Sequence, residues 1–268
     1  MSRSAVPDGS PPLLSIRNVS LRFSGIVALD NVSFDVARGL ICGLIGPNGA
    51  GKTTLFNCLS RLYQPQSGDI VFDGSNLLAA PIHAIAGRGI GRTFQNIALF
   101  ATMTVRDNVM VGGHCRSRGE FFAHLGRLPF VGGEEKRLAE RADVLIEILE
   151  LGSVADVPVS ALTFAVRKRV ELARALASEP KLLLLDEPAG GLNHEEVDRL
   201  CALILSIRER FNVTILLVEH HMNLVMRVSD KVVVLNFGRK IADGAPAEVH
   251  ADPAVISAYL GTETGAAA

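Results

Sequence analysis

The sequence predicts an α/β fold whose core of buried strands carries two further parts, an antiparallel β subdomain and an inserted helical subdomain. Short continuous apolar runs at 40–45, 182–185 and 213–218 are typical of strands covered on both faces. Between the last two runs, apolar residues recur at helical spacing over 197–211, which makes a strand–helix–strand unit. Apolar and polar residues alternate over 14–36 instead, which favours half-buried antiparallel strands.

The bulk composition is that of an ordinary globular protein. The 268 residues include 27 basic and 28 acidic side chains, and 48% are hydrophobic. Charges that nearly cancel give no support to a nucleic-acid surface or a polybasic membrane patch, so we expect no nucleic-acid partner. No apolar run approaches the roughly 20 residues that span a bilayer, so any membrane crossing would belong to another chain.

The two ends and the cysteines carry little information. Residues 1–12 lack an apolar stretch and are expected to form a disordered lead-in, not a signal peptide, and residues 262–268 a disordered tail. The four cysteines lie far apart without paired-ligand spacing. Cys42 and Cys58 stand inside apolar segments, which favours small buried side chains over metal ligands or a disulfide.

The remaining elements follow in chain order. After the buried run at 40–45, apolar residues at helical spacing predict a helix over 52–62 that includes Leu62. Residues 104–165 contain no buried-strand run but do contain an amphipathic helix around Leu138 and Leu145, so we place the helical subdomain at approximately 96–165. A last buried strand at 232–235 turns through 236–238.

The loop between the run at 40–45 and the following helix has the G-x-x-x-x-G-K-[ST] pattern of a phosphate-binding loop. Its residues are Gly46, Pro47, Asn48, Gly49, Ala50, Gly51, Lys52, Thr53 and Thr54. The glycines let successive N–H groups turn toward phosphate oxygens, and the helix adds the partial positive charge of its N-terminus. Lys52 would neutralise the β- and γ-phosphates, and Thr53 would bind Mg²⁺. The strand before and the helix after make a merely glycine-rich turn a poor alternative.

An acidic pair follows the apolar run at 182–185. The strand delivers Asp186 to its carboxyl end, where ligands bind in open α/β sheets. Asp186 suits a Mg²⁺-linked role, and Glu187 suits a general base that polarises the attacking water. An exposed acidic pair after a strand is the alternative, which the phosphate loop upstream disfavours.

From about Leu13 to Gly261 the chain resembles the ABC ATPases, because the phosphate loop, RTFQN, LLLLDEPAGGLN and VEHHM stand in that family's order. The resemblance implies a P-loop NTPase fold that binds ATP and Mg²⁺. It makes Gln95 the Q-loop residue, which contacts Mg²⁺ and water and links to a membrane subunit. It also makes His220 the switch histidine at the γ-phosphate and places Asn193 in the dimer-spanning D-loop. Without this order, nothing would set Gln95 and His220 apart from other polar residues.

The resemblance also places Phe23 where the family stacks an aromatic ring on adenine. Phe23 fits the alternating core face of its strand as well, so core packing is the alternative.

The family's signature loop, roughly L-S-G-G-Q, reads differently in this chain. Thr163 keeps a hydroxyl, whereas Ala165 replaces a glycine and Val166 replaces a glutamine. If Ala165 takes a backbone conformation open only to glycine, the strain is about 1–2 kcal/mol. If its dihedral angles are ordinary, only the added methyl group matters.

Within the family, the chain most resembles the ATPases of branched-chain amino acid importers. The resemblance lies in three stretches, GIGRTFQNIALFATMTVRDNV, LLLLDEPAGGLNHEE and VISAYLG. The resemblance implies an ATP-hydrolysing motor subunit on the cytoplasmic face of the membrane. Its expected partners are permease subunits, a second ABC ATPase and, indirectly, a substrate-binding protein. The altered signature loop favours a heterodimer over a homodimer.

Three functions are alternatives to a transporter ATPase. A soluble ABC ATPase of DNA repair or translation would carry coiled-coil, zinc or tandem insertions, and this sequence has none. A GTPase switch would carry an Asn-Lys-x-Asp segment, which is also missing. A weakly hydrolytic regulatory subunit is motivated by the altered signature loop.

Overall fold

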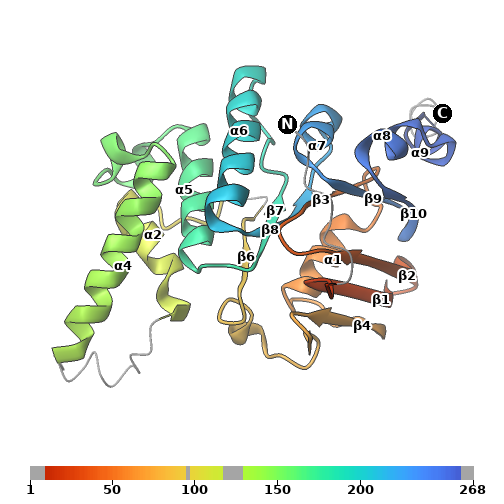
Figure 1. Cartoon of the computed structure of the whole chain (residues 1–268), viewed down its shortest axis with the longest axis horizontal. Helices are drawn as coiled ribbons and strands as arrows, with labels where there is room; N and C mark the ends of the chain where they lie inside the picture. Colours follow the sequence, from red (N-terminus) through yellow and green to blue (C-terminus); the bar gives the residue numbers. More distant parts are fainter. Residues whose placement is uncertain (1–9, 95–96, 117–128, 261–268) are drawn as a thin grey trace. The chain divides into compact units, whose positions relative to one another are not determined.

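The computed structural model of the chain describes residues 10–94, 97–116 and 129–260 (Figure 1). Its contacts divide the chain into two compact units. Unit 1 comprises the residues up to 85 and those from 184 onward, and unit 2 comprises residues 86–183. The helical subdomain that we expect at approximately 96–165 falls within unit 2. The predicted tail and residues 1–9 of the predicted lead-in lie outside the described residues.

Unit 1 contains an antiparallel sheet with the strand order β2-β1-β4-β5. Its strands are β1 (Leu14–Phe23), β2 (Ile26–Val36), β4 (Ser67–Phe72) and β5 (Ser75–Asn76). Strand β1 pairs with β2 from Leu14 opposite Val36, and irregularities in the register follow Ile16, Val19 and Leu21. The alternating pattern is confirmed away from the hairpin end, where the apolar residues of 14–21 and 29–36 are buried and the polar residues between them are half-buried or exposed. At the hairpin end the apolar Phe23, Ile26 and Val27 are exposed instead.

The larger sheet has the strand order β10-β9-β3-β8-β7-β6. Its strands are β3 (Ile41–Ile45), β6 (Ile90–Arg92), β7 (Leu182–Asp186), β8 (Thr214–Val218), β9 (Lys231–Asn236) and β10 (Arg239–Gly244). Strand β6 belongs to unit 2, and β7 leads from unit 2 into unit 1. Strand β3 runs parallel to both β8 and β9. Every residue of β3, β7 and β8 is buried, as the continuous apolar runs predict.

The helices of unit 1 are α1 (Lys52–Leu59), α6 (His194–Phe211), α7 (Met222–Val228), α8 (Pro246–Ala251) and α9 (Pro253–Leu260), with a 3₁₀ turn η1 (Ile82–Ala84). An apolar cluster of the core joins α7, α8 and α9 to strands β3 and β9 of the larger sheet. It contains Ile45, Val225, Val232, Val234, Val249 and Val255.

Helix α1 is shorter than the sequence predicts. The expected helix over 52–62 is wrong at its end, because α1 stops at Leu59 and Arg61 takes the left-handed conformation with φ of 60°. The amide of Leu62 then bonds back to the carbonyl of Asn57, which closes the helix end. Leu62 is 50% exposed, so its helical spacing does not reflect burial.

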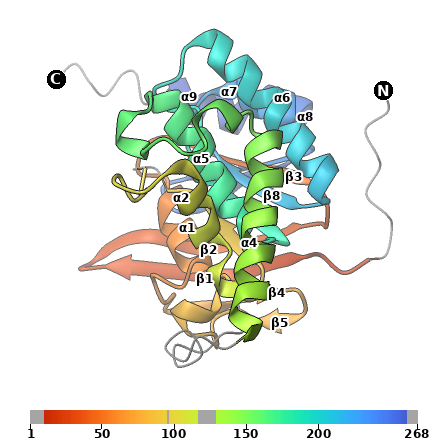
Figure 2. The ribbon, with the colours of Figure 1, turned by 90° about the vertical axis from the view of Figure 1, so that its left-hand side faces the viewer.

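Unit 2 is mainly helical. Besides β6 it contains α2 (Val105–Gly112), α4 (Pro129–Ile148), α5 (Phe164–Ala177) and the 3₁₀ turns η2 (His114–Arg116), η3 (Gly152–Val154) and η4 (Val159–Ala161). Helices α2, α4 and α5 lie side by side (Figure 2). The predicted amphipathic helix is confirmed as α4, which buries Leu145, while Leu149 directly after it is also buried.

Within the described ranges, no helix combines the length and the apolar character that crossing a bilayer requires.

Candidate nucleotide-binding and hydrolysis site

The phosphate loop leads directly from a buried strand of unit 1 into a helix. Strand β3 ends at Ile45, and α1 begins at Lys52 with Gly51 as its N-cap. Because β3 and β8 are parallel, their carboxyl ends lie at the same edge of the sheet. Gly51 has no side chain to satisfy the first amides of α1, so these N–H groups are suited to bind an anion.

Two glycines of the loop have different surroundings. Gly46 has φ of 150°, and a Cβ atom there would lie 2.1 Å from the carbonyl oxygen of Leu235 on β9. Gly49 has φ of 77°, and among the described atoms nothing lies within 4 Å of the position that a Cβ atom would take. The loop is therefore pressed against the sheet at Gly46 and faces open space at Gly49, as a backbone cradle for phosphate requires.

Lys52 is held over the loop. Its side chain is folded back so that Nζ donates hydrogen bonds to the carbonyl oxygens of Gly46 at 2.7 Å and Pro47 at 3.0 Å. Burial lowers the pKa of the Lys52 ammonium, whereas the nearby carboxylates of Glu187 and Asp186 act to raise it. A cation beside two carboxylates is the arrangement that the predicted phosphate and Mg²⁺ chemistry needs.

The acidic pair lies at the end of β7. Asp186 is 2% exposed, whereas the Glu187 side chain is 22% exposed. Glu187 takes the left-handed conformation with φ of 47°, and its N–H donates to the carbonyl of Val218 at 2.9 Å. A non-glycine residue in this conformation costs about 1–3 kcal/mol, a strain found at functional sites. The turn therefore separates a buried carboxylate from a partly accessible one.

The oxygen donors at this edge fit Mg²⁺. Hard cations prefer carboxylate and hydroxyl oxygens, which Asp186 and the exposed Thr53 provide. Thr53 directly follows Lys52, whose pKa responds to the Asp186 charge, so carboxylate and phosphate loop are electrostatic neighbours.

The structure brings His220 to Glu187. His220 follows β8, and its Nδ1 lies 3.9 Å from Oε1 of Glu187. The His220 side chain is 50% exposed, and its ring centroid is 4.7 Å from that of His221. Glu187 and His220 are thus close enough to act on one bound group, although they come from different strands.

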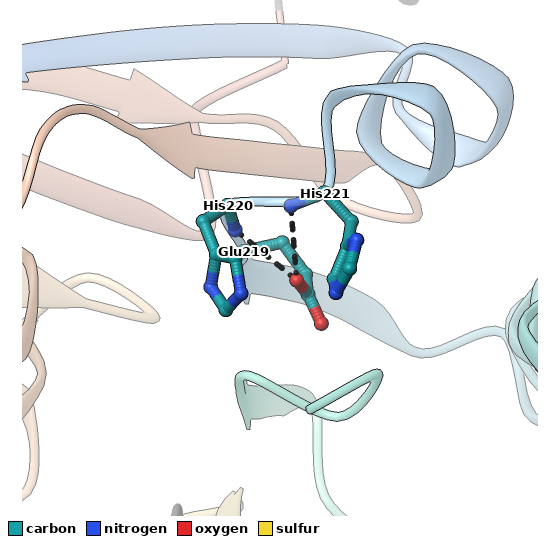
Figure 3. Close-up of side chains that lie close together, drawn as sticks. All are labelled: Glu219, His220 and His221. Atoms are coloured by element: carbon teal, nitrogen blue, oxygen red, sulfur yellow. Dashed lines mark hydrogen bonds between the residues drawn. The ribbon is translucent and has the colours of Figure 1, made fainter. Parts of the chain in front are cut away.

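Sequence reasoning did not identify Glu219, which stands between β8 and His220. Glu219 is fully buried, and its carboxylate accepts hydrogen bonds from the backbone N–H groups of Ala189, His220 and His221. Figure 3 shows the carboxylate between the two histidine side chains. Glu219 is part of the VEHHM stretch, but a single acidic residue at the end of an apolar strand indicates no role by itself, so the sequence singled out only His220 there.

Three further residues that the sequence predicts for the site are Gln95, Phe23 and Asn193. Gln95 lies outside the described residues. Phe23 is 42% exposed and packs edge-to-face on Tyr63 with ring centroids 5.1 Å apart, so core packing is not its role. Asn193 caps α6, accepting the N–H of Glu196 at 3.0 Å while the Glu196 carboxylate accepts the N–H of Asn193.

The altered signature loop begins α5 in unit 2. Thr163 is exposed and is the N-cap of the helix. Ala165 lies within α5, so its backbone is in the right-handed helical region. The glycine-only conformation considered above is therefore not required, and the added methyl group is the only difference from glycine there.

The family described as ABC transporter matches residues 29–190 of this sequence, which is more than half of the chain. The chain belongs to the ABC transporter family. A second family, described as branched-chain amino acid ATP-binding cassette transporter, matches residues 239–264 of this ABC cassette.

This ABC cassette is similar to curated proteins and solved structures over nearly its whole length. It is 42% identical to the high-affinity branched-chain amino acid transport ATP-binding protein BraF of Pseudomonas aeruginosa, over 94% of the chain and 99% of that protein. It is 41% identical to the corresponding protein LivG of Escherichia coli, with the same coverage. A solved ATP-binding cassette of an ABC transporter in its ADP conformation has 29% identity and a TM-score of 0.81, covering 94% of this chain and all of the other.

Proposed function

We propose that this ABC cassette binds and hydrolyses Mg²⁺–ATP and drives the import of branched-chain or related amino acids. The observation that carries the proposal is the edge of the larger sheet, where Lys52, Asp186, Glu187 and His220 come together at the phosphate loop. The similarity to BraF and LivG supports the class of substrate.

Each residue of the site has a separate role in the proposed hydrolysis. Loop amides and Lys52 would bind the β- and γ-phosphates, and Thr53 and Asp186 would hold Mg²⁺, which neutralises charge on the phosphate oxygens. Glu187 would accept the proton of the attacking water. His220, 3.9 Å from Glu187, would contact the γ-phosphate. Glu187 suits the base because its side chain is partly accessible while Asp186 is buried.

Three further residue roles belong to the proposal. Phe23 would stack on adenine, which its exposed ring permits. Gln95 would contact Mg²⁺ and the water and link the site to a permease subunit. Asn193 would lie in the loop that spans the dimer, where its capping of α6 fixes the loop's end.

The assembly that we propose places the cassette at the cytoplasmic face of the membrane, bound to permease subunits that receive amino acids from a substrate-binding protein. The signature loop of a second ABC cassette would complete the ATP site of this chain, and the signature loop of this chain would complete the ATP site of the second cassette. Since Ala165 and Val166 alter that loop in this chain, we favour a heterodimer in which the partner supplies an unaltered loop. The same alteration supports, as the second function, a weakly hydrolytic regulatory subunit.

The experiment that tests the hydrolytic function replaces Glu187 by Gln in the purified complex with the partner subunits. The amide keeps the shape and removes the basicity, so ATP should bind with wild-type affinity while phosphate release stops. Glu195→Gln is the matched control, because Glu195 is an exposed carboxylate in the first turn of α6. Wild-type phosphate release by Glu187→Gln would show that another residue is the base. Phosphate release too slow to measure in the wild-type complex would favour the regulatory subunit.

The transported substrate is tested separately. Cells that lack the chain should lose high-affinity uptake of labelled leucine, isoleucine or valine, and the wild-type chain but not Lys52→Ala should restore it. Unchanged uptake of all three amino acids in the deleted cells would contradict the proposed substrate class.

A further inference from the structure

Glu219 is a fully buried carboxylate in a position that the proposed hydrolytic mechanism does not use. Burying a charged group is unfavourable unless hydrogen bonds or an opposite charge compensate for the lost water. The contacts of Glu219 therefore show what holds the charge inside the protein.

Those contacts are backbone amides from two different segments. Oε1 accepts the N–H of Ala189 at 2.7 Å, in the turn after β7 that also carries Glu187. Oε2 accepts the N–H groups of His220 at 3.1 Å and His221 at 3.3 Å, in the segment after β8 (Figure 3). Ala189 and Glu219 are 30 positions apart in the sequence, so a single side chain joins two separate turns.

A second bond runs beside this connection. The N–H of Glu187 donates to the carbonyl of Val218 at 2.9 Å, which ties the same two strand ends together one residue earlier. The strained backbone of Glu187, with φ of 47°, needs such fixed neighbours to persist. The Glu187–Val218 bond and the bonds of Glu219 therefore both join the segment that carries Glu187 to the segment that carries His220.

A metal site is the other chemistry that this cluster could offer. One ligand atom each from Glu219, His220 and His221 lie within 4.8 Å of one another. However, both carboxylate oxygens of Glu219 face backbone N–H groups, and such donors would compete with a cation for the same lone pairs. The contacts favour a link between turns over a ligand set.

We propose that Glu219 is a positioning residue, which holds the general base Glu187 and the switch residue His220 in register without touching the nucleotide. This inference rests on the proposed ATP hydrolysis. It requires a carboxylate, because two oxygens accept three N–H groups, whereas the amide of glutamine has one accepting oxygen and an NH₂ that would face donors.

The test compares Glu219→Gln with the wild-type chain in the complex with its partner subunits. Glutamine has a single accepting oxygen, so this variant loses the charge-assisted hydrogen bonds either to Ala189 or to His220 and His221. We therefore expect kcat to fall about 10- to 100-fold. The ATP dissociation constant should change less than about threefold, since the phosphate loop and Lys52 are untouched. Wild-type kcat in Glu219→Gln would overturn the inference.

A double-mutant cycle separates positioning from general damage to the fold. Because Glu219 would hold both Glu187 and His220, the double variant Glu219→Gln/His220→Ala should lose less kcat than the two single losses combined. Asp230→Asn is the control, because Asp230 accepts the N–H of Ile41 at the opposite end of β3. This control should lower thermal stability but leave kcat unchanged. Fully additive losses of Glu219→Gln and His220→Ala would contradict the proposal.

Glu219→Asp covers the case in which the glutamine variant does not fold. It keeps the charge and shortens the side chain by one methylene, so kcat should fall in the same direction with ATP affinity retained. A wild-type kcat in Glu219→Asp would then overturn the inference. Absence of hydrolysis in the wild-type complex is a different outcome, which overturns the proposed function and this role with it.

Discussion

The glycines Gly46 and Gly49 should respond differently to the same substitution, because they have different neighbours. At Gly46 an alanine Cβ would lie 2.1 Å from the carbonyl oxygen of Leu235 and 3.1 Å from Cβ of Ala50, at φ of 150°. At Gly49 the described atoms leave the Cβ free of contacts within 4 Å, at φ of 77°. Gly46→Ala therefore adds a clash to backbone strain, whereas Gly49→Ala adds strain alone.

The two costs can be estimated from these contacts. Backbone strain of about 1–3 kcal/mol and overpacking of about 1–3 kcal/mol give roughly 4 kcal/mol for Gly46→Ala. A left-handed alanine gives about 1–2 kcal/mol for Gly49→Ala. At about 3 °C for each kcal/mol in a chain of this size, Tm should fall by roughly 12 °C in the first variant and by roughly 5 °C in the second.

Nucleotide binding should show the opposite order. The methyl group of Gly49→Ala enters the open space that the loop faces, where we place phosphate, so the ATP affinity of the folded protein should fall more in this variant. Thermal unfolding and isothermal titration with ATP measure the two effects. Equal Tm values for the two variants would refute the close approach to β9. Wild-type ATP affinity in Gly49→Ala would refute the placement of phosphate.

Three other perturbations test separate parts of the molecule. Lys52→Ala should abolish measurable ATP binding in a titration, because the cation at the phosphates is lost; unchanged affinity would contradict its assignment. Ala165→Gly should raise ATP hydrolysis by the isolated chain, where the altered loop completes both ATP sites, and by a smaller factor in the mixture with its partner cassette, where it completes one site, while costing up to about 1 kcal/mol of helix stability. Equal hydrolysis by the isolated chain and the mixture would argue against the heterodimer. Burial raises the pKa of the thiols of Cys42 to about 12 and Cys58 to about 11, and it also raises the pKa of the Cys115 thiol. Because only Cys115 of these three is exposed, it alone should be alkylated at pH 8.5, as mass spectrometry can show. Because the folded state keeps the thiol protons of Cys42 and Cys58 longer than the unfolded state, the free energy of unfolding should also decrease as pH rises above 9 toward these two values.

Local patterns in the sequence were sufficient for the elements and for the phosphate loop. Continuous apolar runs identify β3, β7 and β8, since a strand covered on both faces has no polar positions. The glycine spacing and Lys52 identify the loop, because the strand before it and the helix after it are adjacent in the chain. The order of the motifs was sufficient for the family, which the match to residues 29–190 confirms.

Helix ends and backbone angles depend on contacts that no local pattern displays. The spacing of Leu62 continues a helical pattern, yet the left-handed Arg61 ends α1 before it. The sequence left two conformations open for Ala165, and its place inside α5 decides between them. Phe23 matches a core pattern, but it stands at the end of β1 opposite Ile26, where that partner is exposed as well.

The working arrangement of the site is a property of the tertiary structure alone. Glu187 and His220 belong to different strands, and only the order of those strands in the sheet places their side chains 3.9 Å apart. Glu219 is an ordinary acidic residue in the sequence and becomes a connection only because the turn after β7 presents the amide of Ala189 to it. This hydrogen bond joins turns 30 residues apart and forms only when the sheet assembles. The sequence around Ala189 or around Glu219 therefore does not predict it.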